Sequence, residues 1–266
     1  MEKRNVLFVM SSLRNGGAER SLVNLLQLLD YDRYNVDLLL FQNEGMFLKQ
    51  VPKAVNIISN CNKLYTLYDN NKAEALKHPY LSAVHMIGTF ISRKKTNSVA
   101  KSRQYRWEHF YKKIVPELTK EYDVAIAYMQ REQTYFLVDK VKAAKKITWV
   151  HNEYSQLEHF KEMDLEYFEK VDKVVTISDL CAKDLKENFP SIAEKFVVLP
   201  NLTSSRVIRS LAKEFYPPEF KRDMLNIVSI GRLNAQKGFE FALDAALEFF
   251  YHSQVYQLIR DGVSDM

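Results

Sequence analysis

Short apolar runs alternate with amphipathic helical stretches along the first 200 residues of the chain. Residues 5–10 and 36–41 are largely apolar runs of strand length, which is typical of strands buried on both faces of a parallel sheet. Between them, residues 18–29 carry leucines on one stripe of a helix. Further buried strands are predicted at residues 55–58, 123–127, 146–150, 173–177 and 195–199.

Helices are predicted between most of these strands, including residues 107–120 and 157–170. Ser178 follows a predicted strand and is a typical N-cap for a helix over residues 179–188. Alternating strands and helices of this kind predict a doubly wound, Rossmann-like α/β domain. We expect this domain to span residues 1–200.

The pattern changes near residue 200. Residues 201–220 show no strand pattern and end beside Pro217 and Pro218, which indicates a linker. Residues 225–230 then predict a new strand, and a helix is expected from about Gly238. Because one strand and one helix cannot bury a sheet, residues 221–266 predict only the start of a second, incomplete Rossmann-like domain.

The composition is that of an ordinary globular protein, with 47% apolar and 27% charged residues. The two cysteines, Cys61 and Cys181, lie far apart and lack metal-ligand spacing, so we expect a reduced, cytoplasmic protein. The apolar run at residues 6–10 is too short for a secretory signal. The longest apolar stretch, residues 81–92, is shorter than the roughly 20 residues that span a bilayer.

The positive charge is concentrated in residues 72–113, which hold ten Lys or Arg against two Glu, a local net charge of +8. A basic segment that also carries aromatic side chains predicts binding to an anionic partner, either a membrane surface or an anionic acceptor. The alternative is a solvated helical face whose aromatic residues pack inward. These aromatic residues are Tyr80, Phe90, Tyr105, Trp107, Phe110 and Tyr111.

Gly16 and Gly17 lie between the first predicted strand and the first predicted helix. In an open α/β sheet this is the carboxyl edge, where ligands bind. A pair of glycines lets the backbone approach a ligand and exposes amides at a helix N-terminus, which suits phosphate or sugar oxygens. The pattern matches neither the dinucleotide-binding fingerprint nor a Walker loop. The alternative is a tight strand-to-helix connection with no ligand.

A second loop of interest, residues 231–238, also follows a predicted strand and precedes a predicted helix. Its Arg232 and Lys237 are placed to hold a diphosphate from two sides. The alternative is a helix start with two exposed cations.

Together these loops resemble those of the retaining nucleotide-sugar glycosyltransferases of family 4, which have the two-domain GT-B fold. The resemblance extends to about Ala246 and rests on five motifs in a fixed order. The motifs are Gly16-Gly-Ala-Glu-Arg20, Trp149-Val-His-Asn-Glu153, Thr176-Ile-Ser178, Leu199-Pro-Asn201 and Gly231-Arg-Leu with Lys237-Gly238.

In that family the nucleotide diphosphate lies mainly on the second domain and the acceptor mainly on the first. The resemblance implies that Gly16 and Gly17 contact the donor phosphate or sugar, and that His151 hydrogen-bonds the transferred sugar. It also implies that Arg232 and Lys237 neutralise the diphosphate leaving group, which needs neither a metal nor a further cofactor. For His151 the alternative is a histidine that caps a strand end.

The partners that the resemblance implies are a nucleotide-sugar donor and a glycan or lipid-linked acceptor, with no nucleic acid. Polysaccharide assembly at the cytoplasmic face of the cell membrane would agree with the basic segment at residues 72–113.

One feature of the family is not matched. Family members carry two glutamates eight positions apart in the second half of the second domain. Glu240 and Glu248 have that spacing but lie on the helix directly after Gly238, so we do not assign them to the donor. With much of a donor pocket missing, we expect this chain by itself to transfer sugar poorly.

Two other functions compete with sugar transfer. The first is a noncatalytic acceptor- or glycan-binding module, or a partner subunit of a complete transferase. The second is an unrelated dinucleotide-binding enzyme, which would need a glycine fingerprint and a later ribose-binding acid. Gly16, Gly17 and Asp37 do not supply these features.

Overall fold

The computed structural model describes residues 2–58, 62–68, 76–203, 205, 208–209, 212–213, 216, 218, 220, 226–231, 233 and 237–252. The chain divides into two compact units, Met1–Ser204 and Ser205–Met266.

The first unit is built on a seven-stranded, all-parallel sheet with the order β3-β2-β1-β4-β5-β6-β7. Every run predicted as a strand in residues 1–200 is a strand of this sheet, which confirms the predicted α/β fold. The strands are β1 (Arg4–Met10), β2 (Tyr34–Leu40), β3 (Val55–Ile58), β4 (Glu121–Ala127), β5 (Lys142–Val150), β6 (Lys173–Thr176) and β7 (Phe196–Val198).

The strand order reverses between β1 and β4. From β1 the chain continues to β2 and β3 on one side, whereas β4 to β7 follow on the other side. Near the carboxyl end of β1, Met10 pairs with Leu40 of β2 and Val9 pairs with Ala127 of β4. The carboxyl ends of β1 and β4 therefore flank a topological switch point, which is where open α/β sheets bind ligands.

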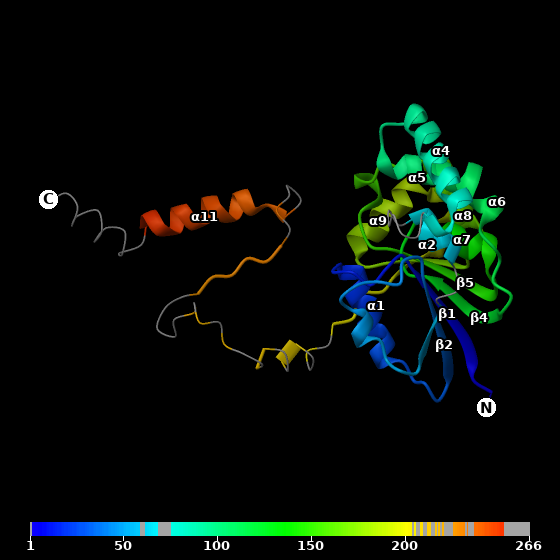
Figure 1. Ribbon diagram of the computed structural model, residues 1–266. Coiled ribbons are helices and arrows are strands. Elements are labelled where there is room, and N and C mark those ends of the chain that lie inside the picture. The colour runs from blue at the N-terminus through cyan, green and yellow to red at the C-terminus, as the bar shows by residue number, and fades with distance from the viewer. Residues whose placement is uncertain are drawn as a thin grey trace, which may run out of the picture. The chain divides into compact units, whose positions relative to one another are not determined.

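Helices cover both faces of the sheet (Figure 1). Helix α1 (Gly17–Leu28) packs Leu22 and Leu26 against Phe8 and Met10 on one face. The opposite face carries the other described α-helices of this unit, with Trp107 and Tyr111 in its core. These are α2 (Asn62–Tyr68), α4 (Pro79–Lys95), α5 (Val99–Arg106), α6 (Lys112–Ile114), α7 (Glu132–Lys140), α8 (Lys161–Glu169) and α9 (Asp179–Asn188).

The observed helix boundaries agree with the sequence-based prediction at the start of α9 and differ from it in two other helices. Ser178 caps α9 by accepting a hydrogen bond from the Cys181 amide, as predicted. The helix predicted over residues 107–120 begins as a π-turn at Trp107–Tyr111 and ends with α6. It ends there because Val115 precedes Pro116 and takes an extended conformation (ψ 127°). The helix predicted from residue 157 begins only at Lys161.

In the second unit, helix α11 (Phe239–His252) begins where a helix was predicted. The strand predicted over residues 225–230 was wrong, because residues 226–230 form no strand. Ile227 and Ile230 are 73% and 93% exposed, and no described residue supplies a neighbouring strand to pair with them. An apolar run becomes a strand only when a neighbouring strand pairs with its backbone groups.

Candidate functional site

The candidate site begins at the diglycine turn between β1 and α1. Gly16 is the N-cap of α1, with φ −97° and ψ 164° and no side-chain cap, and Gly17 is the first helical residue. Neither glycine has a positive φ. A Cβ on Gly17 would meet nothing within 4 Å, and the atoms nearest to a Cβ on Gly16 belong to the flexible Glu19 carboxylate. The start of α1 is therefore open to a ligand beside Gly17, whereas the Glu19 carboxylate fills the space beside Gly16.

The loop that precedes the diglycine turn is held in place by the loop after β2. The Leu13 amide donates to the Glu44 carbonyl at 2.9 Å, and the Phe47 amide donates to the Leu13 carbonyl at 3.1 Å. Gly45 has φ +128° and lies against the Leu13 backbone, where a side chain would collide. Arg14 also forms an ion pair with Glu44. The open start of α1 is therefore presented from a fixed loop.

His151 follows β5 at the same carboxyl edge of the sheet. Its Nε2 lies 3.0 Å from the Tyr128 carbonyl oxygen. Because a carbonyl only accepts, Nε2 carries the proton and Nδ1 is a bare acceptor. Nδ1 is buried and has no partner among the described residues. Burial lowers the pKa of His151 and outweighs the opposing hydrogen bond to Tyr128, so the ring is neutral at pH 7. A buried acceptor without a partner suits a ligand hydroxyl group.

Tyr128 connects His151 to α1. Its amide donates to the Val9 carbonyl of β1 at 2.9 Å, and its hydroxyl oxygen lies 2.9 Å from the Ser21 oxygen on α1. Its ring stacks on Trp149 with centroids 4.8 Å apart. Through these contacts the structure brings the His151 ring and the start of α1 to one edge of the sheet.

Two residues at this edge were not singled out from the sequence. Gln130 and Arg131 follow β4 and precede α7, and Gln130 Oε1 and Arg131 Nε are buried without partners among the described residues. Arg131 also has φ 74° and ψ −126°, a strained conformation that costs about 1–3 kcal/mol and is most frequent at functional sites. The rule that strand ends beside a switch point bind ligands would have pointed to both residues.

The edge therefore combines several groups that can bind a polar ligand: helix amides at Gly16 and Gly17, an acceptor nitrogen on His151, and a guanidinium on Arg131. Such a set suits sugar hydroxyls and phosphate oxygens. Among the described residues, no group of three His, Cys, Asp or Glu side chains could hold a metal ion.

The second predicted loop belongs to the second unit. Arg232 lies outside the described residues, whereas Lys237 is described and directly precedes Gly238, which has φ +60°. Glu240 and Glu248 both lie on α11.

The aromatic residues of the basic segment point in two directions. Trp107 and Tyr111 are fully buried, whereas Tyr80 and Phe90 on α4 are 67% and 62% exposed. Part of the segment therefore packs inward, and α4 keeps an apolar outer face. No described helix is long and apolar enough to cross a membrane.

Neither a protein-family model nor a curated protein sequence matches this chain. Among solved structures, it is similar to Anabaena Alr3699/HepE in complex with UDP-glucose, with 15% identity and a TM-score of 0.41 over 78% of this chain and 48% of that one. It is also similar to the apo form of WaaB, a lipopolysaccharide outer core galactosyltransferase, with 13% identity and a TM-score of 0.43 over 75% of this chain and 46% of that one. The chain spans about half the length of these two proteins.

Proposed function

We propose that this chain takes part in the transfer of a sugar from a nucleotide-diphosphate sugar to a glycan or lipid-linked acceptor, with retention of anomeric configuration. The observation that carries the proposal is the pairing of a helix start that is open beside Gly17 with the unpartnered Nδ1 of His151 at one switch point. The five sequence motifs of the family 4 glycosyltransferases support it.

In this proposal the residues predicted from the sequence have separate roles. The amides at Gly16 and Gly17 bind phosphate or sugar oxygens of the donor, and the neutral His151 accepts a hydrogen bond from a hydroxyl of the transferred sugar. Arg232 and Lys237 are proposed to neutralise the diphosphate as it leaves, which would stabilise charge without a metal ion. The first unit is proposed to hold the acceptor.

The test of this function is a calorimetric titration with UDP-, GDP- and ADP-sugars. We expect one of them to bind, and we expect Gly17→Ala to weaken that binding about tenfold or more, because a methyl group would fill the space beside the helix amides. The same substitution should leave the free energy of unfolding unchanged or raise it by about 0.4–1 kcal/mol, since alanine fits this φ. A variant that loses stability but keeps its affinity would contradict the role of Gly17.

Two further results of the titration separate the competing functions. An Arg232→Ala, Lys237→Ala double variant that loses donor binding would support the proposed diphosphate site on that loop. A folded chain that binds none of the three donors but binds an acceptor glycan would instead favour a noncatalytic acceptor-binding module.

We also propose that α4 contacts an anionic membrane surface. Its outer face carries Tyr80, Met86, Ile87 and Phe90, all more than half exposed. Arg93, Lys94 and Lys95 follow in the last turn of the same helix. Exposed apolar side chains beside clustered cations suit the interface of an anionic bilayer.

Co-sedimentation with phosphatidylglycerol–phosphatidylcholine vesicles checks this surface. The double variant Ile87→Glu, Phe90→Glu should lower vesicle binding at least tenfold, because each lost insertion removes about 1.5–3 kcal/mol. The matched control is Leu28→Glu, Leu180→Glu, which changes the net charge equally at two exposed leucines on α1 and α9. An equal loss of binding in both double variants would exclude α4 as the specific contact.

A further inference from the structure

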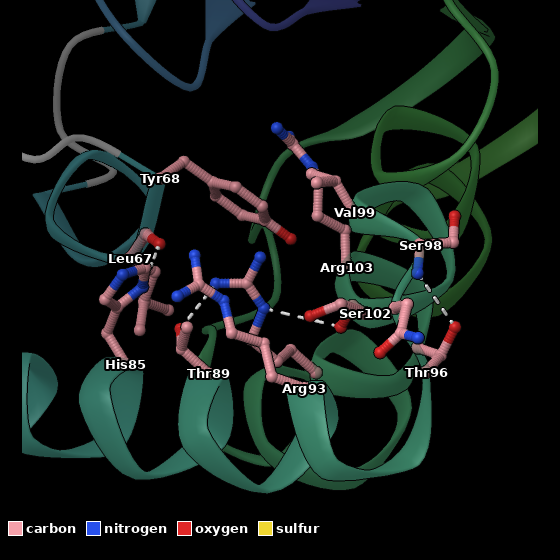
Figure 2. A pocket seen from close by; sticks show the side chains of 12 residues that line it. Leu67, Tyr68, His85, Thr89, Arg93, Thr96, Ser98, Val99, Ser102 and Arg103 are labelled. Carbon is pink, nitrogen blue, oxygen red and sulfur yellow. Dashed lines mark hydrogen bonds between the residues drawn. The ribbon is translucent and has the colours of Figure 1, made fainter.

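A cavity of about 230 Å³ lies in the helical layer between α2, α4 and α5 (Figure 2). Small residues bring α4 and α5 together beside it. The Ser92 and Ser102 hydroxyl oxygens are 2.7 Å apart, and Gly88 leaves room for Phe110 and Arg106. This close packing places the longer side chains of both helices around one space.

The lining of the cavity is strongly basic. It contains Arg93, Arg103 and Arg106 and no acidic residue. Arg103 is paired with Glu132, which lies behind the lining. Arg106 donates to the Thr89 hydroxyl at 2.8 Å, and neither Arg106 nor Arg93 has a carboxylate partner among the described residues. Two guanidinium groups thus keep their charge uncompensated.

A buried hydroxyl group faces the same space. Tyr68 enters the cavity from α2, opposite Thr89 and Arg93 on α4, as Figure 2 shows. Its hydroxyl oxygen is buried and has no hydrogen-bond partner among the described residues. An unsatisfied buried hydroxyl costs about 1–3 kcal/mol, and a ligand oxygen that accepts from it in this cavity would offset that cost.

The start of α5 supplies a third donor set. Ser98 caps this eight-residue helix by accepting from the Lys101 amide, and Thr96, Asn97, Ser98 and Val99 line the cavity. A helix N-terminus carries partial positive charge and free amides, which favour an anion.

The positive potential is also evident at His85, another lining residue. Burial first and the charge of Arg106 second lower the pKa of this histidine. His85 Nδ1 lies 2.9 Å from the Leu67 carbonyl oxygen, so Nδ1 carries the proton in the neutral ring. The positive charge of Arg106 therefore acts on the cavity lining at His85, where burial is the larger cause of the lowered pKa.

The cavity adjoins the candidate site at the carboxyl edge of the sheet. Arg103 reaches Glu132, the residue after Arg131 at the end of β4. On the other side, Gln42 after β2 donates to the Tyr68 carbonyl at 2.7 Å. Short contacts thus connect the cavity with the ends of β2 and β4.

We propose that this cavity binds a phosphate group of the acceptor, so that the chain acts on a phosphorylated or diphosphate-linked acceptor. The identification of the ligand as an acceptor rests on the proposed function. The assignment of the cavity to phosphate does not, because it follows from the hydrogen-bond donors that line the cavity. Arginine forks, a phenol hydroxyl and a helix N-terminus are all donors to phosphate oxygens. A cavity of about 230 Å³ is smaller than the roughly 300–1,000 Å³ of pockets for whole drug-sized ligands, so it suits a phosphate or diphosphate group rather than a nucleotide.

The experiment is a calorimetric titration of the full chain with inorganic phosphate and with pyrophosphate. Tyr68→Phe removes only the unpartnered hydroxyl and should weaken pyrophosphate binding about tenfold without lowering stability. Arg93→Gln should weaken it to a similar extent. Lys94→Gln, which removes a neighbouring exposed charge outside the lining, should change it less than about twofold.

Two results would overturn the proposal. One is the absence of phosphate and pyrophosphate binding by the folded wild-type chain. The other is an equal loss of pyrophosphate affinity in Lys94→Gln and Arg93→Gln, with no loss in Tyr68→Phe. That result would indicate that pyrophosphate binds to diffuse surface charge.

A second arm identifies the source of the phosphate with vesicles of phosphatidic acid in phosphatidylcholine. If Tyr68→Phe weakens vesicle binding and pyrophosphate competes with the vesicles, the phosphate would be assigned to a lipid headgroup. If neither Tyr68→Phe nor added pyrophosphate changes vesicle binding while pyrophosphate still binds in the cavity, the phosphate would be assigned to a soluble acceptor. Both results support the phosphate site. Neither depends on Gly17, so loss of nucleotide-sugar binding in the titration above would refute the proposed function separately.

Discussion

His151→Ala should lower kcat/KM for sugar transfer by on the order of 100-fold while leaving the fold intact. The substitution removes Nδ1, a buried acceptor that has no partner among the described residues. The hydroxyl of the bound sugar would then lose its partner in a site shielded from water. The measurement is steady-state kinetics with the nucleotide sugar that binds in calorimetry, alongside thermal unfolding of both proteins.

His151→Asn is the matched control, because an asparagine side chain can place its amide oxygen near the position of Nδ1. We expect it to recover at least part of the lost rate. If the alanine and asparagine variants both retain wild-type kcat/KM, the proposal that His151 binds sugar would be wrong. The histidine would then be only a residue that caps the end of a strand.

Asp164→Ala should destabilise the first unit by about 3–5 kcal/mol, the largest stability change that we expect from one substitution. The buried carboxylate of Asp164 accepts hydrogen bonds from the Tyr135 and Tyr154 hydroxyls and from Gln104, and it contacts His159 Nδ1 at 2.8 Å. These partners come from α5, α7 and the segment before α8. Alanine would leave several buried donors unsatisfied at once.

Urea unfolding followed by tryptophan fluorescence measures this effect in the first unit, since Trp107 and Trp149 are both buried there and are the only two tryptophans of the chain. Glu166→Ala on the same helix is the control. Its side chain is 59% exposed and pairs with Lys170 at i+4, so its loss should cost less than about 0.5 kcal/mol. Equal unfolding midpoints for the two variants would mean that the Asp164 network adds no net stability.

The sheet was predictable from the sequence because strands such as β1, β2 and β6 are largely buried and contain mostly apolar residues. Residues 36–41 show the strength of this signal, since β2 forms there despite Asp37. Asp37 is accommodated because it accepts hydrogen bonds from Lys120, Tyr122 and Asn56. Burial raises the pKa of Asp37, but these hydrogen bonds together outweigh burial and lower it.

The candidate site was only partly predictable. The Gly16–Gly17 turn and His151 were found because each belongs to a sequence motif that directly follows a predicted strand. The strain at Arg131 and the unpartnered Gln130 depend on backbone geometry that no local pattern encodes. The basic cavity was missed for a related reason. Arg93, Arg103 and Arg106 were seen only as part of a charged segment, whereas the packing of Ser92 on Ser102 directs them to one cavity.

The most direct test of the central claim is nuclear magnetic resonance of the His151 imidazole, with ¹⁵N-labelled histidine and UDP-, GDP- and ADP-sugars added in turn at pH 7. We predict that one donor shifts the Nδ1 resonance of His151, as expected when a bare acceptor gains a hydrogen bond, and that Gly17→Ala abolishes the shift at the same donor concentration. A folded chain whose His151 signals stay unchanged at saturating concentrations of all three donors would contradict the assignment of this edge to a nucleotide sugar.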